Sequence, residues 1–176
     1  AALSLFGFGR KDVVYDYKNA RHVVLQTRNI FESINVKEVN DLLEGMEKGC
    51  KLSVIDIRAT HTSAKADRFF LVRPGSDYAF NLAIIHILLE ENLYDSEFAA
   101  KWIQDLEELR RFAVPYTAEW AEKETGIPAA DIAAFARELA KAKPAVVWHP
   151  GWMTARYRDS FYVCRSIYII NALLGA

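Results

Sequence analysis

The stretch that decides the fold runs from His22-Val-Val-Leu-Gln-Thr27 to Lys51-Leu-Ser-Val-Ile-Asp-Ile57. Both end segments are short apolar runs, which indicate buried strands. Between them lies a helical pattern of apolar residues, formed by Val36, Val39, Leu42, Leu43 and Met46. Gly49 is placed to end this helix in the left-handed conformation. Residues 22–57 are therefore predicted to form a βαβ unit, which implies a parallel sheet.

Two further strands are predicted downstream, Arg68-Phe-Phe-Leu-Val-Arg73 and Pro144-Ala-Val-Val-Trp148. Pro74-Gly75 stops the first of them, and Ser76 is placed to cap a helix from Asp77 to about residue 91.

Residues 95–142 carry helix signals and no strand signal. Asp95, Thr117 and Pro128 are the expected helix starts. A last helix is expected up to Leu174. The prediction is an α/β fold: a three-layer, doubly wound, mainly parallel, Rossmann-like sheet of about four or five strands, with a helical insertion before the last strand. We expect residues 1–176 to form a single α/β domain, with 1–18 as an irregular lead-in.

Composition excludes several classes of protein. The chain has 176 residues, of which 52% are hydrophobic, and its 22 Lys and Arg nearly balance its 23 Asp and Glu. No overall field therefore favours nucleic acid or an anionic membrane, and no apolar run reaches the ~20 residues of a membrane-spanning helix. Cys50 and Cys164 lack metal-site spacing and are expected to be buried. The chain stops inside an apolar helical pattern, so we expect it to be a fragment of a larger catalytic subunit.

The candidate site follows from the strand ends, because ligands of open parallel sheets bind outside the carboxyl ends of the strands. These ends hold Arg28, Asn29 and Glu32 after the first strand, Asp56, Ile57 and Arg58 after the second, Arg73, Gly75 and Asp77 after the third, and His149 and Gly151 after the fourth. The arginines suit phosphates, an acidic residue at the second strand end suits a ribose hydroxyl, and Asp77 suits the amidine-like edge of guanine. A nucleotide fits this set.

Simpler interpretations stay open. Asp77 could serve only the helix dipole, and Arg58 and Arg73 could be surface ion-pair partners. No phosphate-binding loop of the Walker type and no nucleophile with its base is evident. The sequence thus offers binding residues without a reaction centre.

Taken in order, several segments resemble the central part of the molybdopterin oxidoreductases of the dimethyl-sulfoxide-reductase family. The segments that carry the resemblance are 16–29, Val54-Ile-Asp-Ile-Arg58 and Val72-Arg-Pro-Gly-Ser-Asp77, and 84–95, 116–128 and 171–175 add to them. Thr27 and Ile57 depart from the family pattern, which has Gly and Pro there. The loss of Gly is expected to crowd the phosphate loop, and the loss of Pro to free the loop after the second strand.

The resemblance implies one of two related α/β domains that hold a bis-molybdopterin guanine dinucleotide cofactor with molybdenum or tungsten. By residue, it implies that Asn29 and Glu32 contact the nucleotide or its phosphates, that Asp56 and Arg58 contact the ribose and guanine region, that Gly75 and Asp77 contact the guanine edge, and that Gly151 approaches the pterin. A 4Fe-4S cluster and the metal-ligating residue are expected upstream of such a segment, and an active-site arginine downstream, so the fragment alone is expected to be inactive.

The phrase Trp148-His-Pro-Gly-Trp-Met-Thr-Ala-Arg-Tyr157 resembles the branch that reduces polysulfide, thiosulfate, tetrathionate or arsenic oxyanions. In that interpretation His149, Thr154 and Arg156 line the route to the metal; a solvated loop is the alternative. Implied partners are the rest of the catalytic subunit, an iron–sulfur electron-transfer subunit and a membrane anchor, without nucleic acid or direct membrane insertion. The parent enzyme is expected in the periplasm or on the outer face of the cytoplasmic membrane, with the cytoplasm as an alternative. The competing function is a non-redox nucleotide-binding module; a dinucleotide dehydrogenase ranks below it, because the glycine fingerprint is missing.

Overall fold

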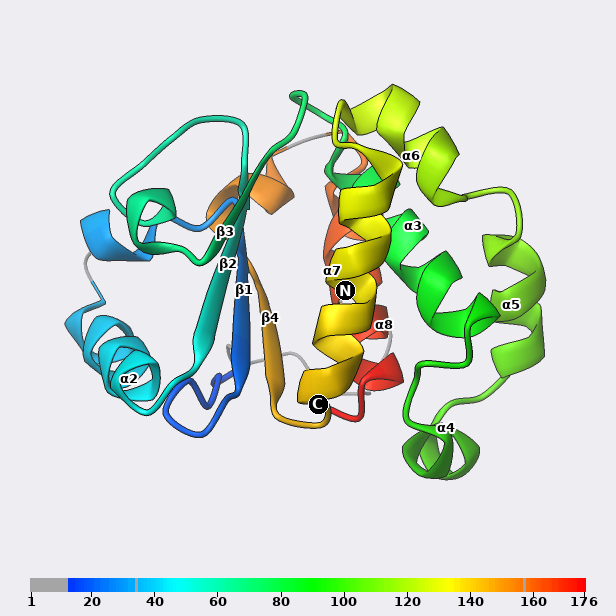
Figure 1. Ribbon diagram of the computed structural model, residues 1–176, viewed down its shortest axis with the longest axis horizontal. Helices are drawn as coiled ribbons and strands as arrows, with labels where there is room; N and C mark the ends of the chain where they lie inside the picture. The colour runs from blue at the N-terminus through cyan, green and yellow to red at the C-terminus, as the bar shows by residue number, and fades with distance from the viewer. Residues whose placement is uncertain (1–12, 34, 157) are drawn as a thin grey trace.

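The computed structural model describes residues 13–33, 35–156 and 158–176. Within them, four parallel strands form one sheet in the order β3-β2-β1-β4 (Figure 1). The strands are β1 (His22–Gln26), β2 (Lys51–Asp56), β3 (Arg68–Leu71) and β4 (Val146–Pro150). The predicted βαβ unit and the parallel sheet are confirmed.

Helices cover both faces of the sheet, which gives the three predicted layers (Figure 1). On one face lies α2 (Val36–Glu47), and on the other lie α3 (Asp77–Glu90), α7 (Ala129–Ala142) and α8 (Ser160–Leu173). The insertion before β4 also contains α4 (Ser96–Trp102), α5 (Leu106–Ala113) and α6 (Ala118–Thr125). Short 3₁₀ turns are η1 (Ile30–Glu32), η2 (Ser63–Lys65) and η3 (Trp152–Ala155).

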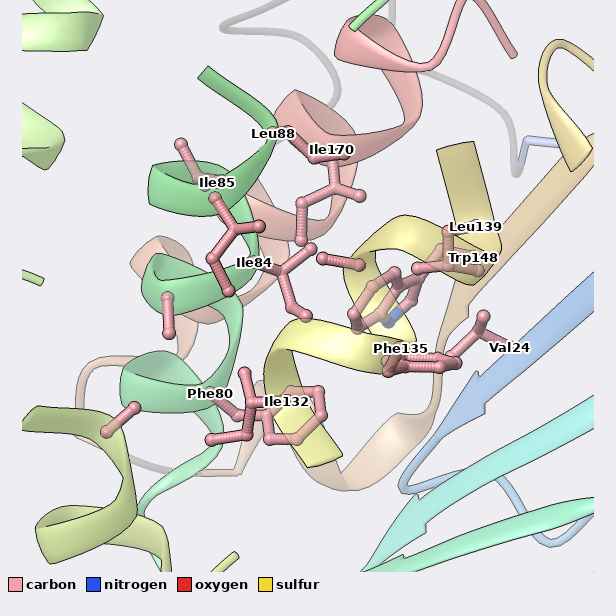
Figure 2. Close-up of a cluster of buried hydrophobic side chains, with 14 of the residues drawn as sticks. Val24, Phe80, Ile84, Ile85, Leu88, Ile132, Phe135, Leu139, Trp148 and Ile170 are labelled. Carbon is pink, nitrogen blue, oxygen red and sulfur yellow. The ribbon is translucent and has the colours of Figure 1, made fainter. Parts of the chain in front are cut away.

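Alternation along β1 divides the core into two clusters, because successive strand residues point to opposite faces. Val23 and Leu25 pack on the α2 side, whereas Val24 joins the larger cluster on the other side. Figure 2 shows that larger cluster, in which Phe135 of α7 and Trp148 of β4 lie close together. Apolar residues line all sides of α3, because other helices and the sheet enclose it.

The fourth strand lies two residues later than predicted. It spans Val146–Pro150, not 144–148, because the Val146 amide donates to the Pro144 carbonyl at 2.8 Å in a turn before the strand. His149 and Pro150 therefore pair with Leu25 and Gln26 inside the sheet, and only Gly151 follows the strand directly.

The helix starts agree with the sequence at Asp95 and Thr117, whose side chains accept from the amides of Phe98 and Trp120. Ser76 occupies the expected position before α3, but the prediction that its side chain caps the helix is wrong. The Ser76 hydroxyl instead donates to the Arg73 carbonyl at 2.7 Å and stabilises the turn through Gly75.

Of the predicted lead-in, residues 13–18 form no helix or strand, and 1–12 lie outside the described residues. Among the described residues, no helix is long and apolar enough to cross a membrane.

Candidate functional site

The strand order places a topological switch point between β1 and β4. The chain steps from β1 to β2 and β3 on one side and returns to β4 on the other side of β1. Ligands of such sheets bind beside the carboxyl ends of the two strands at this point. A cavity of about 450 Å³ lies there, and Arg28, His149 and Gly151 line it together with Tyr15 and Glu38. Three of the predicted site residues thus share one cavity.

Arg28 is largely buried and only partly paired. Its guanidinium donates to the Glu38 carboxylate of α2, and the side chain is 14% exposed. The buried Nε atom has no hydrogen-bond partner. Because a buried donor without a partner costs free energy, this N–H is suited to an acceptor supplied by a ligand.

His149 is held as a neutral ring. It stacks on Tyr15 with ring centroids 4.0 Å apart, and its Nδ1 atom contacts the Tyr17 hydroxyl. Burial, with a further contribution from the charge of Arg28, lowers the pKa of His149 to about 3. Burial raises the pKa of Tyr17, which keeps that hydroxyl protonated. A Tyr17 hydroxyl that donates to Nδ1 leaves the imidazole proton on Nε2, where it can donate to a ligand.

Gly151 allows the exits of β1 and β4 to touch. A Cβ atom at this position would lie 2.0 Å from the Thr27 carbonyl oxygen and 2.7 Å from the Arg28 nitrogen. The Gly151 amide also donates to the Gln26 carbonyl at 2.7 Å. The contact between the two strand exits is therefore what requires glycine here.

Thr27 occupies a strained backbone position. Its φ is +54°, in the left-handed region, and its buried hydroxyl has no hydrogen-bond partner. A β-branched residue is unfavourable in this region, whereas glycine adopts it freely. Glycine, which the resemblance led us to expect here, would adopt this conformation without the strain that Thr27 carries.

Replacing Thr27 by glycine is expected to raise the free energy of unfolding by roughly 1 kcal/mol, because relief of the strain and of the buried hydroxyl exceeds the added entropy of the unfolded chain. Urea denaturation of both proteins measures the difference. Asn92→Gly is the matched control, since Asn92 has a φ of +53° but asparagine tolerates this region. A Thr27→Gly variant no more stable than the parent would contradict this account of the strain.

Asp77 is the most buried of the predicted acidic residues, at 1% exposure. Its Oδ1 atom accepts from Gln26 Nε2 at 3.1 Å, and its buried Oδ2 atom has no partner. Burial raises the pKa of Asp77, partly offset by the Gln26 hydrogen bond. Oδ2 is therefore an acceptor without a protein partner beside the carboxyl end of β1.

Asn29 and Glu32 bind each other, and neither residue lines the cavity. The Asn29 amide donates to the Glu32 carboxylate and accepts from the Thr62 hydroxyl at 2.7 Å. Glu32 also contacts His61 Nδ1 at 2.9 Å. This cluster joins η1 to the loop after β2.

The remaining predicted residues occupy the loops after β2 and β3. The Asp56 carboxylate accepts from the amides of Ile57 at 2.7 Å and Arg58 at 3.3 Å, so it turns the chain there, while both following side chains are exposed. Arg73 donates to the Lys123 carbonyl in the last turn of α6. Gly75 has a φ of +84°, which its turn requires.

Orphaned polar atoms, meaning buried polar atoms without a hydrogen-bond partner, concentrate at the carboxyl edge of the sheet. Four buried side-chain atoms lack hydrogen-bond partners among the described residues, and three belong to Thr27, Arg28 and Asp77; the fourth belongs to Asn81. Buried polar groups are nearly always paired, so each of these atoms would gain a hydrogen bond from a ligand or a water molecule.

Sequence reasoning missed Gln26 and Trp148, which hold Asp77 through hydrogen bonds, and the two tyrosines beside His149. A signal existed for Gln26. It is a polar residue at the end of an apolar strand, and the amide of a buried glutamine needs partners.

Metal ligands are not gathered in the described ranges: they hold no group of three or more His, Cys, Asp or Glu residues that could bind a metal ion. Cys50 is buried and Cys164 half-buried, both as free thiols. Thr154, expected near the metal route, is 1% exposed and donates to the Gly151 carbonyl at 2.6 Å, which stabilises the turn after β4. Arg156 lies over the exposed ring of Trp152.

Comparisons with known proteins agree with this architecture, although no protein-family model matches the chain. The molybdopterin-containing subunit of thiosulfate reductase from Salmonella typhimurium is 34% identical over 164 residues, covering 93% of this chain and 22% of that protein. A putative formate dehydrogenase from Staphylococcus aureus is 36% identical over 104 residues, covering 58% of this chain and 11% of that protein. Acetylene hydratase from Pelobacter acetylenicus has a similar structure, with a TM-score of 0.82 and 28% identity over 90% of this chain and 22% of that chain.

The fold and the comparisons together show an α/β segment that is similar to part of a molybdopterin-containing subunit. The chain is related to one segment of the molybdopterin oxidoreductases of the dimethyl-sulfoxide-reductase family, which confirms the resemblance seen in the sequence. It spans less than a quarter of the length of the thiosulfate reductase subunit and of acetylene hydratase.

Proposed function

We propose that this chain binds one molybdopterin guanine dinucleotide at the carboxyl edge of its sheet, as part of a molybdenum or tungsten oxidoreductase. The observation that carries the proposal is the concentration of orphaned buried atoms at Thr27, Arg28 and Asp77. A ligand that supplies donors to Asp77 and acceptors to Arg28 would satisfy two of these atoms at once.

The residues present fit such a cofactor chemically. Asp77 would accept from the guanine ring N–H and the exocyclic amine, whereas Arg28 and neutral His149 would donate to phosphate or pterin acceptors. Asn29, Glu32, Asp56, Arg58, Arg73 and Gly75 would border the nucleotide from the neighbouring loops. When bound, the cofactor supplies a metal centre that exchanges an electron pair or an oxygen atom with the substrate.

The proposed substrate of the whole enzyme is a small sulfur or arsenic oxyanion. The similarity to a thiosulfate reductase subunit over 93% of the chain supports this choice. An iron–sulfur electron-transfer subunit and a membrane anchor are the proposed partners. Assays of the intact, metal-loaded enzyme with thiosulfate, tetrathionate, polysulfide and arsenate test the substrate class, and turnover of none of them would contradict it.

Guanosine diphosphate is expected to raise the melting temperature of the chain more than adenosine diphosphate does. At a ligand concentration 100 times the dissociation constant, the stabilisation is about 2.7 kcal/mol. The Asp77→Asn variant is expected to lose this preference, because it replaces an acceptor with a donor that faces the guanine donors. Thermal denaturation with each nucleotide measures both effects.

Asp131→Asn is the matched control, since Asp131 also lies in the first turn of a helix, α7, but is exposed. It should retain the preference for the guanine nucleotide. Equal stabilisation of the parent chain by both nucleotides would overturn the guanine assignment. Guanine-selective binding without redox activity of the intact protein would favour the non-redox nucleotide-binding module.

A further inference from the structure

A buried chain of hydrogen bonds leads from β4 through β1 to α3. The indole Nε1 of Trp148 donates to Gln26 Oε1 at 3.0 Å, and Gln26 Nε2 donates to Asp77 Oδ1 at 3.1 Å. Trp148 and Gln26 are fully buried, and Asp77 is nearly so. The three residues come from three different elements, and they meet beside the switch point of the sheet.

The chemistry of tryptophan fixes the direction of this chain. An indole N–H can only donate, so the amide of Gln26 must turn its oxygen toward Trp148. The Gln26 nitrogen then faces the Asp77 carboxylate, as observed. A flipped amide would set a donor against the indole donor and a carbonyl oxygen against the carboxylate, which are both unfavourable contacts.

Trp148 is itself held firmly. The side-chain amide of Asn171 in α8 donates to the Trp148 carbonyl and accepts from the Trp148 amide, each at 2.9 Å. The Trp148 ring packs against Phe80 and Phe135, as Figure 2 shows. The indole N–H therefore has one position, and the orientation of Gln26 follows from it.

We propose that Trp148 and Gln26 are positioning residues that set the base specificity of the site. Through them, Asp77 Oδ1 keeps a fixed donor, while the buried Oδ2 atom has no protein partner and remains an acceptor for a ligand that reaches it. Such a carboxylate favours bases that present donors at that edge, as guanine and hypoxanthine do, over adenine, whose ring nitrogen there is an acceptor. This inference rests on the proposed function.

Two variants interrupt the series of hydrogen bonds from Trp148 to Asp77 at different places. Trp148→Phe keeps an aromatic ring but removes the indole N–H, and Gln26→Met keeps the side-chain length but removes both hydrogen bonds. Each is expected to reduce the preference for guanosine over adenosine diphosphate by about tenfold, because either change leaves the Asp77 carboxylate without its oriented donor, and losing a hydrogen bond to a charged group has about this effect. Isothermal titration calorimetry with guanosine, inosine and adenosine diphosphates measures the three affinities.

Ser166→Ala is the control, because it also removes a buried partner of an α3 side chain. The Ser166 hydroxyl accepts from the Asn81 side chain at 3.0 Å, which links α8 to α3. This bond is not one of those that connect Trp148, Gln26 and Asp77. It is expected to lower the melting temperature while the ratio of nucleotide affinities stays that of the parent. A purely structural role for Trp148 and Gln26 predicts the same result for their variants.

The outcomes separate the two proposals. A guanine preference in the parent chain that persists in Trp148→Phe and Gln26→Met overturns the positioning role and leaves the proposed function intact. If Trp148→Phe does not fold, Gln26→Met decides alone. A parent chain with no guanine preference overturns the proposed function and this inference with it.

Discussion

Replacing Gly151 by alanine is expected to lower the free energy of unfolding by about 3 kcal/mol or more, at the upper end of what overpacking costs. The new Cβ would lie 2.0 Å from the Thr27 carbonyl oxygen and 2.4 Å from its carbonyl carbon. These are backbone atoms, so no side-chain rotation relieves the contact. The exits of β1 and β4 would have to separate, which would break the hydrogen bond from the Gly151 amide to Gln26.

Urea denaturation compares this variant with Gly49→Ala. Gly49 has a φ of +94° and open space around the Cβ position, so alanine there costs only backbone strain, roughly 1–2 kcal/mol. A Gly151→Ala variant that loses no more stability than Gly49→Ala would show that the strand exits separate easily. The cavity beside Arg28 and His149 would then be less rigid than the contacts indicate.

Acidification from pH 6 to pH 4 is expected to remove on the order of 5 kcal/mol of stability through two buried histidines. Burial lowers the pKa of His149 to about 3 and that of His22 to about 4, whereas both rings titrate near 6.5 when exposed. Between these values the unfolded chain binds protons that the folded chain does not. Their contribution is complete above pH 6.5 and falls by about 1.4 kcal/mol per pH unit for each ring as the pH decreases.

Asp77 opposes this trend. Burial raises its pKa, so its contribution increases as the pH falls through the raised value and offsets part of the histidine effect. Urea denaturation at several pH values is expected to show a much flatter dependence for the His22→Gln, His149→Gln double variant. His61→Gln, which replaces an exposed ring, should retain the parent's pH dependence. A parent chain equally stable at pH 6 and pH 4 would contradict the burial of the two neutral rings.

Local sequence signals were sufficient for the sheet and its helices. The apolar runs at 22–27 and 51–57 form neighbouring strands that pair with each other. The helix starts at Asp95 and Thr117 depend on hydrogen bonds to amides only three residues away. The start of β4 was harder, because the Val146 amide bonds back to Pro144 within an apolar run. A pattern of residue types does not reveal this turn.

The residues that follow the strand ends could be predicted from the sequence, but the arrangement of their side chains could not. Arg28 and His149 share a cavity, whereas Arg73 binds a carbonyl of α6 and Asp56 binds backbone amides of its own loop. These outcomes depend on distant segments: Glu38 of α2 for Arg28, and Tyr15 and Tyr17 for His149. The roles of Gln26 and Trp148 depend on residues that are 122 positions apart and meet only after the sheet has formed.

The side chain of Asn171 also affects how this sheet can associate. Every second residue of β4 turns its backbone away from β1, namely Val146, Trp148 and Pro150. The Val146 amide binds Pro144, Asn171 occupies both backbone groups of Trp148, and proline has no amide hydrogen. An incoming strand would find no free N–H along this edge, so we expect it to resist the edge-to-edge pairing that leads to aggregation. Any extension of the sheet would then take place beside β3.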